Sequence, residues 1–269
     1  MSVPLYFRKS GYGPALIILH GLFGASDNWV SFAKRLEKHF TIFIPDLRNH
    51  GQSPHTPTHT YQDMIGDLIR FFNDHNLEKA TILGHSMGGK LAMMFAAEYP
   101  ELVTGLIVAD ISPKRYNCEF KTVAQHELIL GLMDGLNLAA VTSRKEIDYF
   151  LSEKLKDRTL RQFLLKNIHR NKEGYFEWKI NVPVLRYALS SITSEVNVDW
   201  FTDRKPILNY PVTFIRGLNS DYITDQDISL INDIYPEARV IDIADAGHWL
   251  HAEQPEKFIE AVLSSVQGG

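Results

Sequence analysis

Short apolar runs alternate along the chain with segments in which apolar residues recur every three or four positions. Near-continuous apolar runs are typical of buried parallel strands, and the three- and four-residue steps are typical of helices with one buried face. The pattern predicts an α/β fold with a mostly parallel central sheet flanked by helices. The expected strands are Ala15–Leu19, Phe40–Ile44, Ala80–Leu83, Leu106–Ile111, Val212–Ile215 and Arg239–Ile243. The expected helices are Asn28–Lys38, Tyr61–Asn73, Met87–Glu98, Asp225–Ile234 and Pro255–Val266.

This alternation stops between about Pro113 and Pro206. The interval is rich in helix formers and has no strand-like core run until Val212. We therefore expect a core domain over residues 1–112 and 207–269, and a helical cap over residues 113–206 inserted before the penultimate strand. Its expected elements are the helices Glu119–Leu136, Lys145–Lys156 and Thr159–Arg170, and a turn or small strand at Tyr175–Trp178.

Composition narrows the classes of protein to consider. The chain has 269 residues, of which 45% are hydrophobic and 22% charged, and a net charge of −4. This balance gives no bulk attraction to nucleic acid or anionic lipid, so we expect neither as a partner. The only cysteine, Cys118, excludes an internal disulfide and fits a reducing compartment. No apolar stretch approaches the roughly 20 residues of a membrane-spanning helix; we expect a cytoplasmic protein without membrane insertion, and leave its oligomeric state open.

Ser86 lies in the strongest chemical motif of the chain, at the junction of an expected strand and an expected helix. Gly84 and Gly88 stand two residues before and after it. Glycines at these positions let the backbone turn sharply from strand to helix and leave the serine hydroxyl exposed. This is the G-x-S-x-G pattern of a serine nucleophile, so we interpret Ser86 as the catalytic nucleophile.

A serine nucleophile needs a base to take its proton, and in this fold the base comes late in the chain. His248 follows the last expected strand, and Gly247 before it allows the loop to bend back toward the serine. The neighbouring His251 leads into the final helix, where support of the loop is its expected role. We therefore assign the base to His248.

The oxyanion of the reaction needs two backbone N–H donors. Met87, the residue after the nucleophile, is expected to supply one. The glycine-containing loop after the first strand is expected to supply the other from Leu22, with Phe23 as the alternative. His20 and His85 flank these two turns, and we expect both to be structural.

Two aspartates follow strands and fit the chain order serine, acid, histidine. Asp221 comes after the strand that follows the cap, the usual place of the acid in this fold. Asp110 ends the strand just before the cap. The residues alone leave both open as the third member of the catalytic triad.

Five motifs together resemble the YbfF-type esterases, a branch of the α/β-hydrolase superfamily. The resemblance covers nearly the whole chain and is strongest outside the cap. It implies an α/β-hydrolase fold, and an acid at Asp110, because the branch often lacks an acidic residue at the position of Asp221. The motifs are His20–Gly24, Asp46–Ser53, Gly84–Gly89, Asp110–Pro113 and Gly247–Trp249.

The resemblance implies hydrolysis of short- to medium-chain acyl esters through an acyl-enzyme on Ser86, with acyl-CoA thioesters as a candidate substrate class. No metal-binding, phosphate-loop or dinucleotide motif is present, so we expect no cofactor and no metal. A cofactor-free carbon–carbon bond hydrolase, haloperoxidase or aminopeptidase is an alternative, as is a non-catalytic ligand-binding protein on this fold. In the cap, a set of apolar residues is expected to line the pocket or form the cap's own core: Tyr116, Phe120, Phe176, Trp178 and Leu185.

Overall fold

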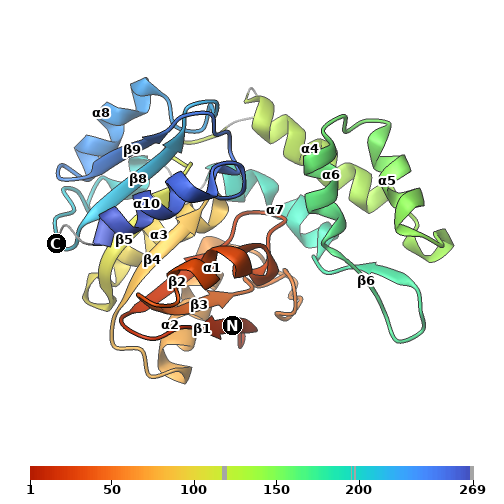
Figure 1. Cartoon of the computed structure of the whole chain (residues 1–269), viewed down its shortest axis with the longest axis horizontal. Helices are drawn as coiled ribbons and strands as arrows, with labels where there is room; N and C mark the ends of the chain where they lie inside the picture. Colours follow the sequence, from red (N-terminus) through yellow and green to blue (C-terminus); the bar gives the residue numbers. More distant parts are fainter. Residues whose placement is uncertain (117–119, 195, 197, 267–269) are drawn as a thin grey trace.

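A central sheet organises the part of the chain that the computed structural model describes, residues 1–116, 120–194, 196 and 198–266 (Figure 1). Within these residues it has seven strands in the order β1-β3-β2-β4-β5-β8-β9. The edge strand β1 is antiparallel to β3, and all other neighbours are parallel. The expected fold class is confirmed. The strands are β1 (Phe7–Ser10), β2 (Ala15–Leu19), β3 (Thr41–Pro45), β4 (Ala80–His85), β5 (Val103–Ala109), β8 (Val212–Gly217) and β9 (Arg239–Ile243).

Helices cover both faces of the sheet, because side chains alternate between the two faces along each strand. In β2, Leu16 and Ile18 pack with buried residues of α1 and α10. Ile17 and Leu19 pack on the opposite face with residues of α2, α3 and α8. These helices are α1 (Val30–Leu36), α2 (Tyr61–Asp74), α3 (Met87–Glu98), α8 (Asp225–Ile234) and α10 (Pro255–Val266). Short helices are η1 (Ser26–Trp29), η2 (Pro100–Leu102), η3 (Leu138–Ala140), η4 (Val198–Phe201) and α9 (Leu250–Glu253).

The segment between β5 and β8 lies to one side of the sheet, where Figure 1 shows it in green. Its elements are α4 (Lys121–Gly135), α5 (Arg144–Ser152), α6 (Arg158–Leu165), β6 (Ile168–Arg170), β7 (Phe176–Trp178) and α7 (Val182–Ser194). No helix among the described residues is long and apolar enough to cross a membrane. Cys118 and Glu119, the expected first residue of α4, lie outside the described residues.

The sequence-based prediction was wrong at three places. The helix expected over Thr159–Arg170 ends at Leu165, because a turn with Gly174 at φ 89° folds Ile168–Arg170 back onto β7. The helix α7 was not predicted, although Leu185, Leu189 and Ile192 repeat at helical spacing. The strand β1 was also missed, because it is a partly exposed edge strand with no continuous apolar run.

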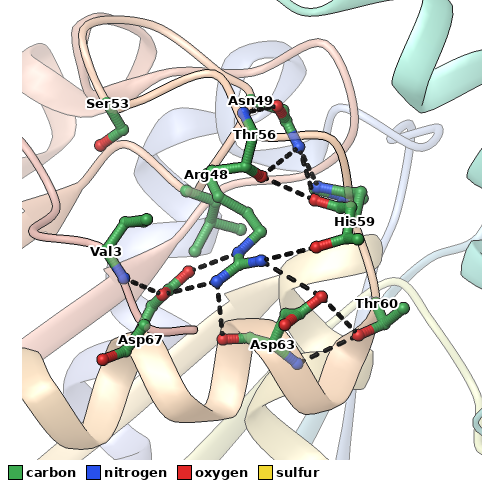
Figure 2. Close-up of polar contacts among 12 residues, drawn as sticks. Val3, Arg48, Asn49, Ser53, Thr56, His59, Thr60, Asp63 and Asp67 are labelled. Atoms are coloured by element: carbon green, nitrogen blue, oxygen red, sulfur yellow. Dashed lines mark hydrogen bonds and ion pairs between the residues drawn. The ribbon is translucent and has the colours of Figure 1, made fainter.

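A buried arginine fixes the loop between β3 and α2 (Figure 2). Arg48 donates from Nε and Nη2 to the two carboxylate oxygens of Asp67, at 2.6 and 2.8 Å, and each side chain is only 1% exposed. Arg48 Nη1 also lies 3.2 Å from a carboxylate oxygen of Asp63. The N–H of Val3 donates to Asp67 at 2.7 Å. The pair therefore binds both the loop and the N-terminal residues to α2.

The same loop contacts the start of α7. Asn181 donates from its backbone N–H to the carbonyl of Asn49 at 2.9 Å, and from Nδ2 to Asn49 Oδ1 at 3.0 Å. Asn49 is itself held by the backbone N–H of Thr56 and the carbonyl of Thr58, at 2.7 and 2.9 Å. The position of α7 thus depends on a loop that Arg48 anchors to α2.

A buried lysine connects the two ends of the inserted segment to α3. Lys90 is 1% exposed, and its Nζ donates to the carbonyls of Lys114, Thr193 and Val196 at 2.8, 3.3 and 2.5 Å. Lys114 lies just after β5, where the chain leaves the sheet, and the other two lie at the end of α7. Burial lowers the pKa of Lys90 to about 7. Only the charged ammonium has the three N–H groups needed to donate to three carbonyls.

Replacing one partner of the buried pair tests its contribution to stability. Asp67→Asn leaves the guanidinium of Arg48 buried without its carboxylate, and should lower the free energy of unfolding by about 3–5 kcal/mol. Asp74→Asn in the same helix is the control, because Asp74 pairs with Arg70 on the exposed surface at 3.2 Å. Its loss should be below about 0.5 kcal/mol. Urea unfolding measures both, and equal losses would contradict the anchoring role.

Candidate active site

Ser86 stands in a strained turn between β4 and α3. Its backbone has φ 54° and ψ −120°, a conformation that residues other than glycine rarely adopt. The two glycines of the motif make the turn possible, because a Cβ at Gly84 would overlap the carbonyl of Gly88, and a Cβ at Gly88 that of Leu19. The turn places Ser86 at the carboxyl ends of the parallel strands, the edge at which ligands bind in this class of sheet.

His248 lies in the loop after β9 and connects two side chains. Its Nε2 is 3.0 Å from Ser86 Oγ, and its Nδ1 is 2.8 Å from Asp110 Oδ2. The ring of Tyr222 stacks on the imidazole with 3.9 Å between centroids and 15° between planes. His85 donates from Nε2 to the backbone carbonyl of His248 at 2.8 Å. The imidazole is therefore held on one ring face and through its own backbone.

The structure brings one of the two candidate acids into contact with His248. Asp110 is fully buried, and besides His248 it accepts hydrogen bonds from Ser220 Oγ at 2.5 Å and from the N–H of Gly217 at 3.2 Å. Asp221 is exposed and makes no hydrogen bond to His248 within the described residues. Ser220 is a partner that sequence reasoning missed, since its neighbour Asp221 carried the motif.

Burial sets the protonation of this group of side chains. It lowers the pKa of His248 to about 3, so the imidazole is neutral and can accept a proton at Nε2. Burial also raises the pKa of Asp110 to about 7, while the hydrogen bonds from Ser220 and Gly217 act in the opposite direction. Above that pH the pair holds a neutral imidazole beside a carboxylate, which is the form that removes a proton from a serine hydroxyl.

Leu22 and Met87, the expected oxyanion donors, both line a cavity at Ser86. Neither Leu22 nor Met87 donates its N–H to an acceptor among the described residues. Met87 is the first residue of α3, where a helix leaves its N–H groups free. His20 links the loop that contains Leu22 to the loop after β3. Its Nδ1 lies 2.9 Å from the Gly21 carbonyl, and its Nε2 accepts a hydrogen bond from the N–H of Leu47 at 3.0 Å.

Two cavities meet at Ser86, and Leu22, His126 and Tyr222 line both. We call the smaller one, of about 20 Å³, the inner cavity and the larger one, of about 60 Å³, the outer cavity. The inner cavity is lined further by Met87, Lys90, Ile111, Tyr116, Val123, Ile192 and Thr193. The outer cavity is lined further by Gly21, Phe23, His85, Thr122, Gln125, Ile129, Leu160, His248 and Trp249.

The other candidate residues lie in different surroundings. His251 stacks on Trp29 with 4.2 Å between centroids, which fits the expected support of the loop. Of the aromatic and apolar residues expected in the pocket or in the cap's own core, Tyr116 lines the inner cavity, and Phe176 and Leu185 are buried in the hydrophobic core. Sequence reasoning missed His126 and Lys90, because a single polar residue on a helix has no recognisable pattern.

Comparisons with known proteins agree on one family. The model of the family described as "alpha/beta hydrolase fold" matches residues 14–255. The sn-1-specific diacylglycerol lipase ABHD11 of Danio rerio is 34% identical over 97% of this chain and 81% of its own length. Esterase YbfF of Escherichia coli is 34% identical over 92% of this chain and 91% of its own. The solved structure titled "Marine microorganism esterase" is 43% identical, with a TM-score of 0.93 over 98% of this chain and 99% of that one.

The turn at Ser86 can be tested by adding one methyl group. Gly88→Ala forces the new Cβ against the carbonyl of Leu19, and should lower the free energy of unfolding by about 1–3 kcal/mol. The displaced Ser86 should react about 100-fold more slowly with a fluorophosphonate. Gly131→Ala is the control, because nothing lies within 4 Å of a Cβ there. Labelling of the Gly88 variant at the wild-type rate would contradict the steric argument.

Proposed function

This chain belongs to the α/β-hydrolase family, in its YbfF-type esterase branch, and we propose that it hydrolyses carboxylic esters through an acyl-enzyme formed on Ser86. The esterase and lipase relatives support its standing as a carboxylic ester hydrolase. One observation carries the proposed mechanism. Ser86 Oγ lies 3.0 Å from His248 Nε2, and His248 Nδ1 lies 2.8 Å from Asp110 Oδ2, so the carboxylate can orient the imidazole that takes the serine proton.

The first half of the reaction forms the acyl-enzyme. His248 accepts the proton of the Ser86 hydroxyl at Nε2 as Oγ attacks the ester carbonyl carbon. The N–H groups of Leu22 and Met87 hold the oxyanion of the tetrahedral intermediate. Asp110 stabilises the imidazolium from the Nδ1 side. His248 then gives its proton to the leaving alcohol, and the acyl group remains on Ser86.

The second half of the reaction returns the enzyme to its starting state. His248 takes a proton from a water molecule, whose oxygen attacks the acyl carbonyl. The same two N–H groups hold the second oxyanion. Ser86 leaves as its proton returns from His248, and the carboxylic acid is released. One water is consumed for each ester cleaved.

We place the acyl group in the inner cavity and the alcohol in the outer one. The inner cavity's volume of about 20 Å³ is room for about one water-sized group, which favours short acyl chains. His248, which protonates the leaving alcohol, lines the outer cavity. Residues 113–206 act as a cap over a core of residues 1–112 and 207–269, because this segment supplies Val123, His126 and Ile192 to the cavity walls.

A basic surface beside the outer cavity supports thioesters of coenzyme A as a second substrate class. An open cavity of about 550 Å³ shares Thr122, Gln125 and Leu160 with the outer cavity. Three exposed lysines and two exposed aspartates line it, which leaves an excess of positive charge: Lys121, Lys154, Lys156, Asp157 and Asp221. Such a surface attracts the phosphates of a leaving group too large for the outer cavity.

Parallel substitution of the two aspartates tests the proposed acid. Asp110→Asn removes the carboxylate that orients His248 and should lower kcat for a short-chain ester about 10⁴-fold. Asp221→Asn is the matched control and should keep kcat at about the wild-type value, since Asp221 is exposed. Ser86→Ala sets the background rate. A large loss in the Asp221 variant, with none in the Asp110 variant, would reverse the assignment.

A pair of thioesters tests the basic surface. The double variant Lys121→Ala/Lys154→Ala should raise KM for acetyl-CoA about threefold to tenfold, because two ionic contacts are lost. KM for the acetyl thioester of N-acetylcysteamine, which lacks phosphate, should stay unchanged. The difference should shrink at high salt. Equal effects on both thioesters would show that the lysines do not contact the phosphates.

A further inference from the structure

His126 carries a polar atom that the fold leaves without a partner. It projects from α4 into the wall that both cavities share, beside Ser86. Its Nδ1 is buried and has no hydrogen-bond partner among the described residues. An unpaired buried nitrogen costs free energy that an apolar side chain of similar size would not. Such a group in a cavity wall is explained if a ligand provides the missing partner.

The imidazole of His126 is neutral, and this determines which hydrogen bonds it can make. Burial lowers its pKa to about 3, and nearby His248 acts in the same direction. A neutral imidazole offers one N–H donor and one acceptor nitrogen. A hydroxyl or an amide can pair with either of these nitrogens, because each of these two groups carries both a donor and an acceptor. A neutral imidazole also offers an anion no opposite charge.

The packing of the ring places it on the alcohol side of the substrate. His126 contacts Phe23 edge to face, with 5.7 Å between centroids and 67° between planes. Phe23 and His248 line the outer cavity and are not among the residues that line the inner one. His248 is the group that protonates the leaving oxygen, so the part of His126 that lines the outer cavity lies where the alcohol part of the ester leaves.

From these observations we propose that His126 hydrogen-bonds a second polar group on the alcohol part of the substrate, close to the ester oxygen. The enzyme thereby selects esters of hydroxylated or amide-bearing alcohols over esters of simple alkyl alcohols. This inference rests on the proposed function, because it needs an ester whose carbonyl lies at Ser86. A site that leaves a buried polar group unpaired discriminates against a substrate that lacks its partner.

Two acetate esters of equal size test the selection. 2-Hydroxyethyl acetate and n-propyl acetate share the acyl group and differ in one terminal hydroxyl against one methyl. The quantity measured is the ratio of their kcat/KM values, compared between variants, so that the intrinsic reactivities of the two esters cancel. His126→Phe and His126→Leu each remove both nitrogens, so a folding defect in one leaves the other to decide. Labelling of Ser86 by a fluorophosphonate confirms that each variant has a formed site.

The expected result is a loss of about tenfold in this ratio in both variants, the effect of one hydrogen bond. His126→Asn keeps an amide near the position of Nδ1 and should recover part of the ratio. His169→Phe is the matched control, since His169 lies in β6, away from both cavities, and also has a buried Nδ1 without a partner. Its ratio should equal that of the wild type.

The two levels of the proposal fail in different ways. If wild type and the His126 variants cleave both esters with the same ratio, this inference is overturned and the proposed function stands. If His169→Phe lowers the ratio as much as His126→Phe, direct contact by His126 is also overturned. If the wild type cleaves neither ester and Ser86 takes up no fluorophosphonate, the proposed function fails, and this inference fails with it.

Discussion

The buried carboxyl of Asp110 is the contact on which the geometry of the site depends. A carboxyl group without access to water must find its hydrogen bonds inside the protein. Asp110 obtains them from Ser220, Gly217 and His248, which lie in the loops after β8 and β9. The ends of three neighbouring strands are thereby drawn to one point. Only in this arrangement does the imidazole reach Ser86, whose own position follows from the turn after β4.

Much of the fold was predictable from the sequence, because it depends on local patterns. Met87–Glu98 and Arg239–Ile243 were expected with the bounds that the structure has, since periodic apolar residues and glycines mark them. Which of Asp110 and Asp221 contacts His248 was not predictable from the residues alone. Both follow strands at the same edge of the sheet, and burial and backbone direction separate them: Asp110 points inward from a φ of 50°.

The inserted segment was the least predictable region, because its structure also depends on contacts between residues distant in sequence. The small sheet of β6 and β7 has three residues in each strand, too few for a periodic pattern. Some contacts of the inserted segment with the rest of the protein come from single polar residues, such as Asn181 on Asn49. His126 is a further case, because its value as a cavity-wall residue arises from what surrounds it in space. Chemistry that depends on such tertiary neighbours leaves no trace in a one-dimensional pattern.

The three hydrogen bonds from Lys90 to backbone carbonyls affect how the sequence and length of the inserted segment can change in evolution. The carbonyls come from Lys114 near the start of the inserted segment and from Thr193 and Val196 at and after the end of α7, so the stretch between them behaves as a closed loop fixed at one ammonium group. The entropic cost of closing a loop grows only slowly with its length. Residues between the two ends can therefore be added, deleted or exchanged while the sheet and the Ser86 turn keep their geometry. If the inserted segment acts as the proposed cap, substrate range could change in it separately from the chemistry at Ser86.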